Sequence, residues 1–247
     1  MTCAIALDTE TTDLTDPDVI ELAATAPIAA PDVDLLGIER RTHRFKPRKP
    51  ISLGALATHH ILESDLEGCE PWTGSWAIPE GVTYVVAHNA DFDWKAIGSP
   101  HVARICTLAL SRSLWPDLDS HSLGAMTYFL QGRDALTREL LRGAHSASTD
   151  LILCMHLLRS ILKMLPATQS WHQLWVASER ARLPKFLTFG KYGPHSDWAK
   201  ASGFTKGMPI GELQHRDPGY LSWLLGGRCD VVNEDLYLQK ALRGEAA

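Results

Sequence analysis

The sequence predicts an α/β domain followed by a smaller basic module, and three observations support this division. Over the first part of the chain, apolar runs of strand length alternate with segments of helical periodicity. From Leu183 onward, the sequence becomes rich in Gly, Pro, Lys and aromatic residues. Residues 1–150 carry 12 Lys and Arg against 21 Asp and Glu, whereas residues 151–247 carry 12 against 8. We therefore expect a domain at 1–166, a helical connector at 167–182 and a C-terminal basic module at 183–247.

The individual elements follow from periodicity and from turn residues. Short apolar or alternating segments predict strands at 3–7, 19–26, 41–45 and 82–87. Periodic segments predict helices at 50–60 with Ser52 as the N-cap, and at 92–97, 107–114, 122–130, 148–165 and 171–182. Pro, Asp and Gly residues predict a turn region at 29–36 and a loop at 66–80.

Composition limits the class of protein. A chain of 247 residues with 45% hydrophobic content can form one core and a small appendage. No apolar run approaches the length that crosses a bilayer, and the N-terminus lacks the features of a signal peptide. Five widely spaced cysteines without metal-binding spacing fit a reduced, cytoplasmic protein. The net charge of −5 is that of an ordinary soluble surface, but bound divalent cations would let an acidic domain approach nucleic acid.

Asp8 and Glu10 lie two residues apart at the end of the first predicted strand. Side chains with this spacing point to the same face of a strand, where two carboxylates repel each other unless a cation lies between them. A hard divalent ion such as Mg²⁺ takes oxygen ligands. The alternative is a strand end that has reached solvent, because a lone Asp-x-Glu triplet is common.

Asp150 precedes a helix whose apolar stripe predicts its inward face. This carboxylate lies four residues before Cys154, the first residue of the stripe, and so belongs to the same face. A buried carboxylate needs a partner, and a metal ion shared with Asp8 and Glu10 would provide one. Alternatively, Asp150 is a first-turn carboxylate that the helix dipole favours.

His145 lies five residues before Asp150, which corresponds to about 140° of helical rotation. Because the two side chains could not share a face within one helix, we expect His145 in the loop after Gly143 and Ala144. A histidine beside metal-bound water suits a general base at neutral pH. The alternative is an ordinary surface histidine, since the chain has 11.

The segment from His88 to Asp93 follows the strand predicted at 82–87. Sheets of α/β domains place ligand-binding groups at the ends of strands. Chemistry alone leaves Asp91 and Asp93 as alternative metal ligands.

Together these motifs resemble, in order and setting, those of the DEDD-type 3′–5′ exonucleases of the histidine subclass. This group belongs to the ribonuclease H-like superfamily, and the resemblance covers about residues 3–163. It implies a mixed sheet flanked by helices. It also implies four metal carboxylates and one general base, with Asp91 in a variable position: Asp8, Glu10, Asp93, Asp150 and His145.

The resemblance further implies a two-metal hydrolysis with Mg²⁺ or Mn²⁺ that releases 5′-mononucleotides from a 3′ end. Asp8 would bridge both ions, and His145 would deprotonate the attacking water. The segment after Glu10 resembles the family's contact with the terminal nucleotide, and Asn89 would shape the pocket. The expected substrate contacts are therefore Thr11, Thr12, Leu14 and Asn89, with an ordinary polar turn as the alternative.

Segments 105–123, 189–193 and 216–225 are similar to the bacterial exodeoxyribonuclease X family, which favours DNA as the substrate. In that family the Gly and Lys after the Phe-Gly-Lys-Tyr motif are contiguous with it, whereas residues 194–205 intervene here. Lys191 and Lys206 are expected to contact DNA phosphates, and aromatic residues of the module to stack on bases. The alternative is that the aromatic residues form the module's core, which we favour for Phe186 and Phe189.

The expected partner is DNA with a 3′ end, with no membrane involved, and a homodimer is a common assembly in the subclass. Two other functions share these features. One is a 3′–5′ exoribonuclease on the same fold, because the carboxylates do not distinguish DNA from RNA. The other is a non-catalytic nucleic-acid-binding module, which the five intact catalytic positions disfavour.

Overall fold

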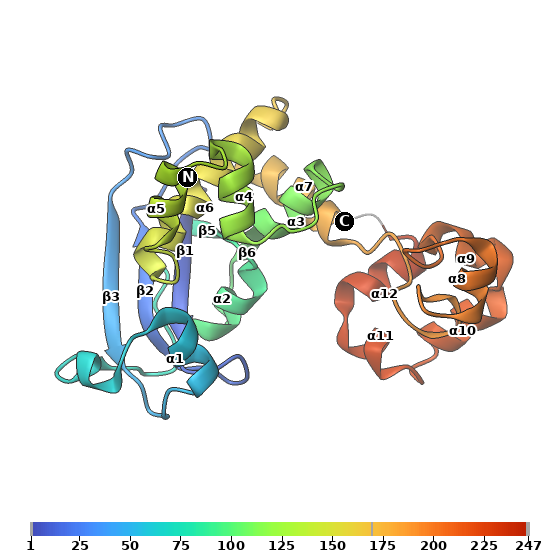
Figure 1. Cartoon of the computed structure of the whole chain (residues 1–247), viewed down its shortest axis with the longest axis horizontal. Helices are drawn as coiled ribbons and strands as arrows, with labels where there is room; N and C mark the ends of the chain where they lie inside the picture. The colour runs from blue at the N-terminus through green and yellow to red at the C-terminus, as the bar shows by residue number, and fades with distance from the viewer. Residues whose placement is uncertain (1, 169, 246–247) are drawn as a thin grey trace. The chain divides into compact units, whose positions relative to one another are not determined.

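The computed structural model describes residues 2–168 and 170–245 and divides the chain into two compact units, Met1–Ser178 and Glu179–Ala247 (Figure 1). The boundary lies inside helix α7 (Trp171–Arg182), in the segment that we assigned to the connector. Each unit has its own buried core and is described separately.

A six-stranded mixed sheet forms the centre of the first unit, in the order β4-β3-β2-β1-β5-β6. Strand β1 lies antiparallel to β2 and parallel to β5. Its residues 4–7 are completely buried, which explains the uninterrupted apolar run in the sequence. The strands are β1 (Cys3–Thr11), β2 (Val19–Thr25), β3 (Arg40–Lys46), β4 (Glu70–Pro71), β5 (Val82–Ala87) and β6 (Ala103–Cys106).

Helices cover the sheet of the first unit. Helix α6 packs across β1, β2 and β3, while α2 packs against β1, β5 and β6. Helices α3 and α4 pack on α6. The helices are α1 (Leu53–His59), α2 (Ala90–Ala96), α3 (Thr107–Leu114), α4 (Leu123–Gln131), α5 (Ala135–Leu141), α6 (Ala147–Met164) and α7, with a 3-10 turn η1 (Glu63–Leu66). Among the described residues, none of the helices is both long and apolar enough to cross a bilayer.

The α/β class and most of the predicted elements are confirmed within two or three residues, and Ser52 caps α1 through its side chain. Strand β6 and helix α5 were missed. The four residues of β6 include Arg104, which lies 4.2 Å from the Trp94 ring centroid and 2.8 Å from Asp91. These contacts are tertiary, and no local pattern predicts them. Helix α5 is only seven residues long, so its periodicity is weak. The loop predicted at 66–80 also contains the two-residue strand β4.

The second unit consists of short helices around one apolar core. They are η2 (Gly190–Tyr192), α8 (Asp197–Ser202), α9 (Ile210–Arg216), α10 (Pro218–Leu225), α11 (Asp230–Glu234) and α12 (Leu236–Arg243). Phe189 packs against this core, as expected, and so does Trp198. The rings of Trp198 and Phe204 stack at 5.2 Å, so both aromatic residues are engaged within the unit.

Segment 194–205, which we expect to be an insertion, contains α8, and the chain after it forms hydrogen bonds with residues that precede it. The Met208 N–H donates to the Tyr192 carbonyl at 2.9 Å, and the Leu187 N–H donates to the Met208 carbonyl at 2.9 Å. Gly207, with a φ of 87°, directly precedes Met208, and a Cβ there would meet the Leu187 carbonyl oxygen at 2.0 Å. Glycine is therefore required at this close approach of two backbone segments.

Candidate active site

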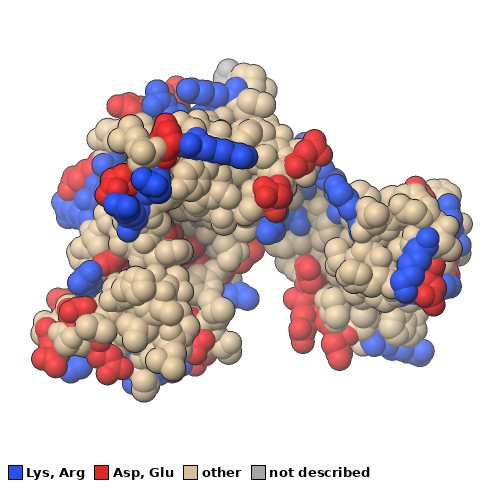
Figure 2. Space-filling view, in the orientation of Figure 1, with Lys and Arg blue, Asp and Glu red and all other residues tan. Residues whose placement is uncertain are grey.

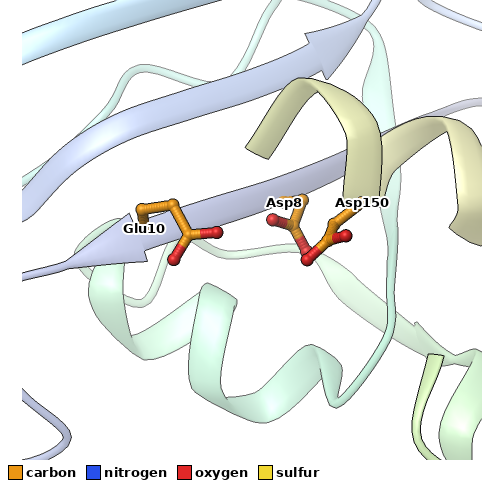
Figure 3. Close-up of side chains that lie close together, drawn as sticks. All are labelled: Asp8, Glu10 and Asp150. Carbon is orange, nitrogen blue, oxygen red and sulfur yellow. The ribbon is translucent and has the colours of Figure 1, made fainter. Parts of the chain in front are cut away.

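Three carboxylates meet at the end of β1. Asp8 and Glu10 project from the same face of the strand, and Asp150 reaches them from the first turn of α6 (Figure 3). One oxygen of each lies within 4.8 Å of the others. The inward orientation expected of Asp150 is confirmed, because Cys154 on the same face is 1% exposed.

The start of α6 brings Asp150 and His145 together. Ser146 is the N-cap, and its hydroxyl accepts from the Thr149 N–H at 3.3 Å. His145 lies before the helix in a left-handed conformation with a φ of 64°, as expected of a loop residue. Its backbone N–H donates to Asp150 Oδ2 at 3.3 Å, while its side chain is exposed. The backbone of this loop is therefore tied to the carboxylate, and the imidazole faces solvent.

Asp93 and Asp91, the two alternatives in the second motif, have different surroundings. Asp93 is 3% exposed, and its Oδ1 accepts from both the Thr9 N–H at 3.1 Å and the Thr9 hydroxyl at 2.8 Å. Asp91 instead forms an ion pair with Arg104 at 2.8 Å. Asp93 is thus the carboxylate that adjoins β1, although it does not belong to the three-carboxylate group.

Burial raises the pKa of each of these four carboxylates, and repulsion from the neighbouring carboxylates adds to the shift for Asp8 and Glu10. Burial, then the charges of Asp93, Asp150 and Glu10, raise the pKa of Asp8 well above its usual value. Burial and the Asp150 charge raise the pKa of Glu10 to about 8. Burial raises the pKa of Asp93 to about 7, against the opposing effect of its bonds from Thr9. Burial also raises the pKa of Asp150, while the His145 N–H opposes this shift.

The donor set fits a divalent metal ion. Within the part of the chain that the structure describes, none of the ion pairs involves Asp8, Glu10 or Asp150. Crowded carboxylates without a cationic partner have oxygen ligands and negative charge to offer, which Mg²⁺ and Mn²⁺ prefer. Asp8, Glu10 and Asp150 could hold such ions directly, and Asp93 lies close enough to add to the field at Asp8.

A pocket of about 380 Å³ opens beside Glu10 and is lined by Thr11, Leu14 and other residues. Leu14 is 83% exposed, so its side chain is available at the pocket's edge. Thr12 is 1% exposed, and its hydroxyl accepts from the Asp18 N–H at 3.0 Å, which gives it a structural role. Asn89 is exposed and begins α2 in a left-handed conformation with a φ of 70°. Of the four expected substrate contacts, the structure places two at the pocket.

Sequence reasoning missed Thr9, Glu21 and His59. Thr9 is the middle residue of the Asp-x-Glu triplet and holds Asp93. Glu21 is a carboxylate in a strand whose other residues are all buried, and a charged residue within such a run was the available signal. His59 lines the pocket beside Glu10, and no local pattern distinguishes it from the other histidines of the chain.

The two lysines expected to contact DNA differ in their surroundings. The Lys191 ammonium lies 2.6 Å from Asp217 Oδ2 and 5.0 Å from the Tyr192 ring centroid. Lys206 is exposed and directly precedes the constrained Gly207. Basic and acidic side chains are interspersed on the face of this unit that Figure 2 shows.

Known proteins resemble this chain in both sequence and fold. No family model matches it. Exodeoxyribonuclease 10 of Escherichia coli strain K12 is 30% identical over 236 residues, which cover 94% of this chain and 94% of that protein. The structure of exonuclease X in complex with 5′ overhanging duplex DNA matches with a TM-score of 0.51 and 26% identity, over 69% of this chain and 99% of that one. The zinc-bound exonuclease I complex of E. coli with single-stranded DNA has a TM-score of 0.52 at 14% identity, over 67% and 41%, and shows the fold alone.

The mixed sheet and flanking helices of the first unit are therefore those of a ribonuclease H-like exonuclease, as the sequence motifs predicted. The match to exodeoxyribonuclease 10 covers the second unit as well as the first, so it identifies one family within this class. The chain belongs to the exodeoxyribonuclease X family.

The raised carboxylate pKa values predict how stability depends on pH. Glu10 titrates at about 8 in the folded protein and at 4.5 when its pKa is unperturbed. Between these values the folded state binds a proton that the unfolded state lacks, so the metal-free protein should lose stability as the pH rises from about 5 to about 8. Glu10→Gln should remove much of this loss, as measured by thermal unfolding in EDTA. Glu39→Gln, an exposed control, should retain it. A metal-free protein that is as stable at pH 8 as at pH 5 would contradict the raised pKa of Glu10.

Proposed function

We propose that this protein hydrolyses phosphodiester bonds from the 3′ ends of DNA and releases 5′-mononucleotides. The observation that carries the proposal is the group formed by Asp8, Glu10 and Asp150 at the end of β1, with Asp93 beside it. Membership of the exodeoxyribonuclease X family supports DNA as the substrate.

In this proposal Asp8, Glu10, Asp93 and Asp150 hold two divalent ions, Mg²⁺ or Mn²⁺. Such ions, when bound, activate water and stabilise the negative charge that develops on the phosphate. His145 accepts the proton of the attacking water, because its exposed imidazole lies on the loop whose backbone bonds to Asp150. The Thr9 bonds to Asp93 fix that carboxylate against β1.

The 3′ terminal nucleotide would occupy the pocket beside Glu10. Its volume of about 380 Å³ suits a small group such as one nucleotide. Thr11 lines this pocket, and Leu14 would contact the terminal base from its edge. Asn89, at the start of the helix that carries Asp93, would contact the same nucleotide.

Digestion of end-labelled DNA tests the proposal. With Mg²⁺ or Mn²⁺, labelled mononucleotides should be released from a 3′-labelled oligonucleotide first, and EDTA should stop the reaction. Asp150→Asn should lower the rate by about 100-fold or more, because one metal carboxylate is lost. Asp32→Asn, an exposed control, should match the wild type. A folded protein that leaves DNA intact with both metals would contradict the proposal, and digestion of an RNA oligonucleotide instead would favour the exoribonuclease.

Substitution of Leu14 should weaken the binding of a DNA 3′ end and leave the stability of the fold unchanged. Leu14→Ala should raise KM for a 3′ end by about tenfold, since full burial of a leucine side chain is worth about 1.5–3 kcal/mol. Leu136→Ala is the matched control, because that leucine is 81% exposed, compared with 83% for Leu14. Both variants should unfold at the same temperature as the wild type. Unchanged end digestion by Leu14→Ala would remove this residue from the substrate site.

We also propose that Lys206 and Lys191 contact the DNA backbone. Lys206→Gln should weaken DNA binding and reduce the slope of log affinity against log salt by about 0.9, the value for one phosphate contact. Lys191→Gln should do the same only if its ammonium leaves Asp217 on binding. Lys163→Gln, an exposed residue in the last turn of α6, is the control. A salt slope that does not change for Lys206→Gln, measured in Ca²⁺ to prevent hydrolysis, would contradict the contact.

A further inference from the structure

Glu21 is a further buried carboxylate beside the four at the candidate active site. It lies directly opposite Glu10 in the β1–β2 ladder and directly opposite Arg44 in the β2–β3 ladder. Only 3% of it is exposed. Like charges in such cross-strand pairs are destabilising, and a buried carboxylate is costly without hydrogen bonds. Glu21 must therefore have hydrogen-bond partners that compensate for its burial beside Glu10.

Both carboxylate oxygens of Glu21 accept hydrogen bonds. Its Oε2 accepts from the backbone N–H of Ala147, the first residue of α6, at 2.9 Å. Its Oε1 accepts from Arg44 Nε at 2.9 Å. The first N–H groups of a helix have no partner within the helix, and Ala147 is completely buried, so water cannot replace Glu21 there. The Ser146 hydroxyl, which caps this helix, bonds to Thr149 instead.

We infer that Glu21 is a positioning residue that anchors the first turn of α6 to the sheet and thereby holds Asp150 and His145 at the other carboxylates. This inference rests on the proposed function of that site. Ala147 lies two residues after His145 and three before Asp150, so one hydrogen bond fixes the turn that carries both. A displacement of about 1 Å at such a site lowers a rate by up to about 100-fold.

Of the two contacts, the hydrogen bond from Ala147 is the one that positions the first turn of α6. Arg44 is 45% exposed in its side chain, so water can replace Glu21 as its partner. The buried N–H of Ala147 has no such replacement. An uncharged acceptor at position 21 should therefore preserve the function, whereas an apolar residue of similar size should not.

Four variants separate the acceptor from the charge. Glu21→Leu removes the acceptor, while Glu21→Gln keeps an acceptor and removes the charge. Ala147→Pro removes the donor from the other side, at the first helical position, where proline is tolerated. The extended backbone of Ser146, with a ψ of 134°, is the conformation that a following proline requires. Arg44→Gln breaks the ion pair alone, and Glu39→Gln breaks the exposed Glu39–Arg41 pair as a matched control.

The first measurements need no DNA. In the metal-free protein, hydrogen exchange of the Ala147 amide should be faster by about tenfold or more in Glu21→Leu. Mn²⁺ affinity, measured by calorimetry, should fall by about tenfold in Glu21→Leu and Ala147→Pro, because Asp150 is no longer held in place. In Glu21→Gln and Arg44→Gln both quantities should stay within about threefold of wild type. Unchanged amide exchange in folded Glu21→Leu would overturn the anchor.

Kinetics with the labelled oligonucleotide complete the test. Glu21→Leu and Ala147→Pro should lower kcat by about 10- to 100-fold and change KM by less than about threefold, whereas Glu21→Gln should restore kcat. A Glu21→Gln variant as impaired as Glu21→Leu would overturn the inference in favour of a role for the charge. If the wild type does not digest DNA, the proposed function fails, and amide exchange and Mn²⁺ affinity still decide whether Glu21 anchors α6.

Discussion

The structure of the first unit depends on a concentration of negative charge at the end of a buried strand. Asp8, Glu10 and Asp150 approach one another without a cationic partner among the described residues, and Asp93 adds to the repulsion. In the metal-free protein, burial favours protonation of Glu10 and Asp93 and so raises their pKa values, and repulsion adds to the shift of Glu10. The rest of the domain must therefore supply enough packing to hold the carboxylates together, and the completely buried residues of β1 and α6 do so.

Hydrogen bonds rather than ion pairs hold these groups in place. Thr9 donates twice to Asp93, and the His145 N–H donates to Asp150. Arg44, which lies opposite Glu21 on β3, is paired with Glu21 and not with a carboxylate of the three-membered group. This separation preserves negative charge where a divalent cation would bind, since an arginine among the ligands would neutralise it.

The sequence predicted the α/β class because its strands and long helices have strong periodicity, as in β1 and α6. It predicted that Asp8, Glu10 and Asp150 lie together, because these residues belong to short motifs at strand and helix ends. The geometry explains what was missed. The choice between Asp91 and Asp93 depends on Thr9 and Arg104, which lie on other elements. The contact of Glu21 with the start of α6 was not predicted, because its partner Ala147 is 126 residues away in the chain. Thr12 was expected at the substrate, but its hydroxyl stabilises the turn to Asp18.

The two ends of segment 194–205 lie close together in the second unit. Because Met208 bonds to Tyr192 and Gly207 lies against Leu187, the segment begins and ends at nearly the same place, while Trp198 within it packs against the core. Changing the length of a surface loop whose ends are already close costs little free energy, since the entropy of closure grows only slowly with length. A change of length between residues 194 and 205 would thus cost little closure entropy, and its main cost would be the loss of the packing that Trp198 contributes to the core.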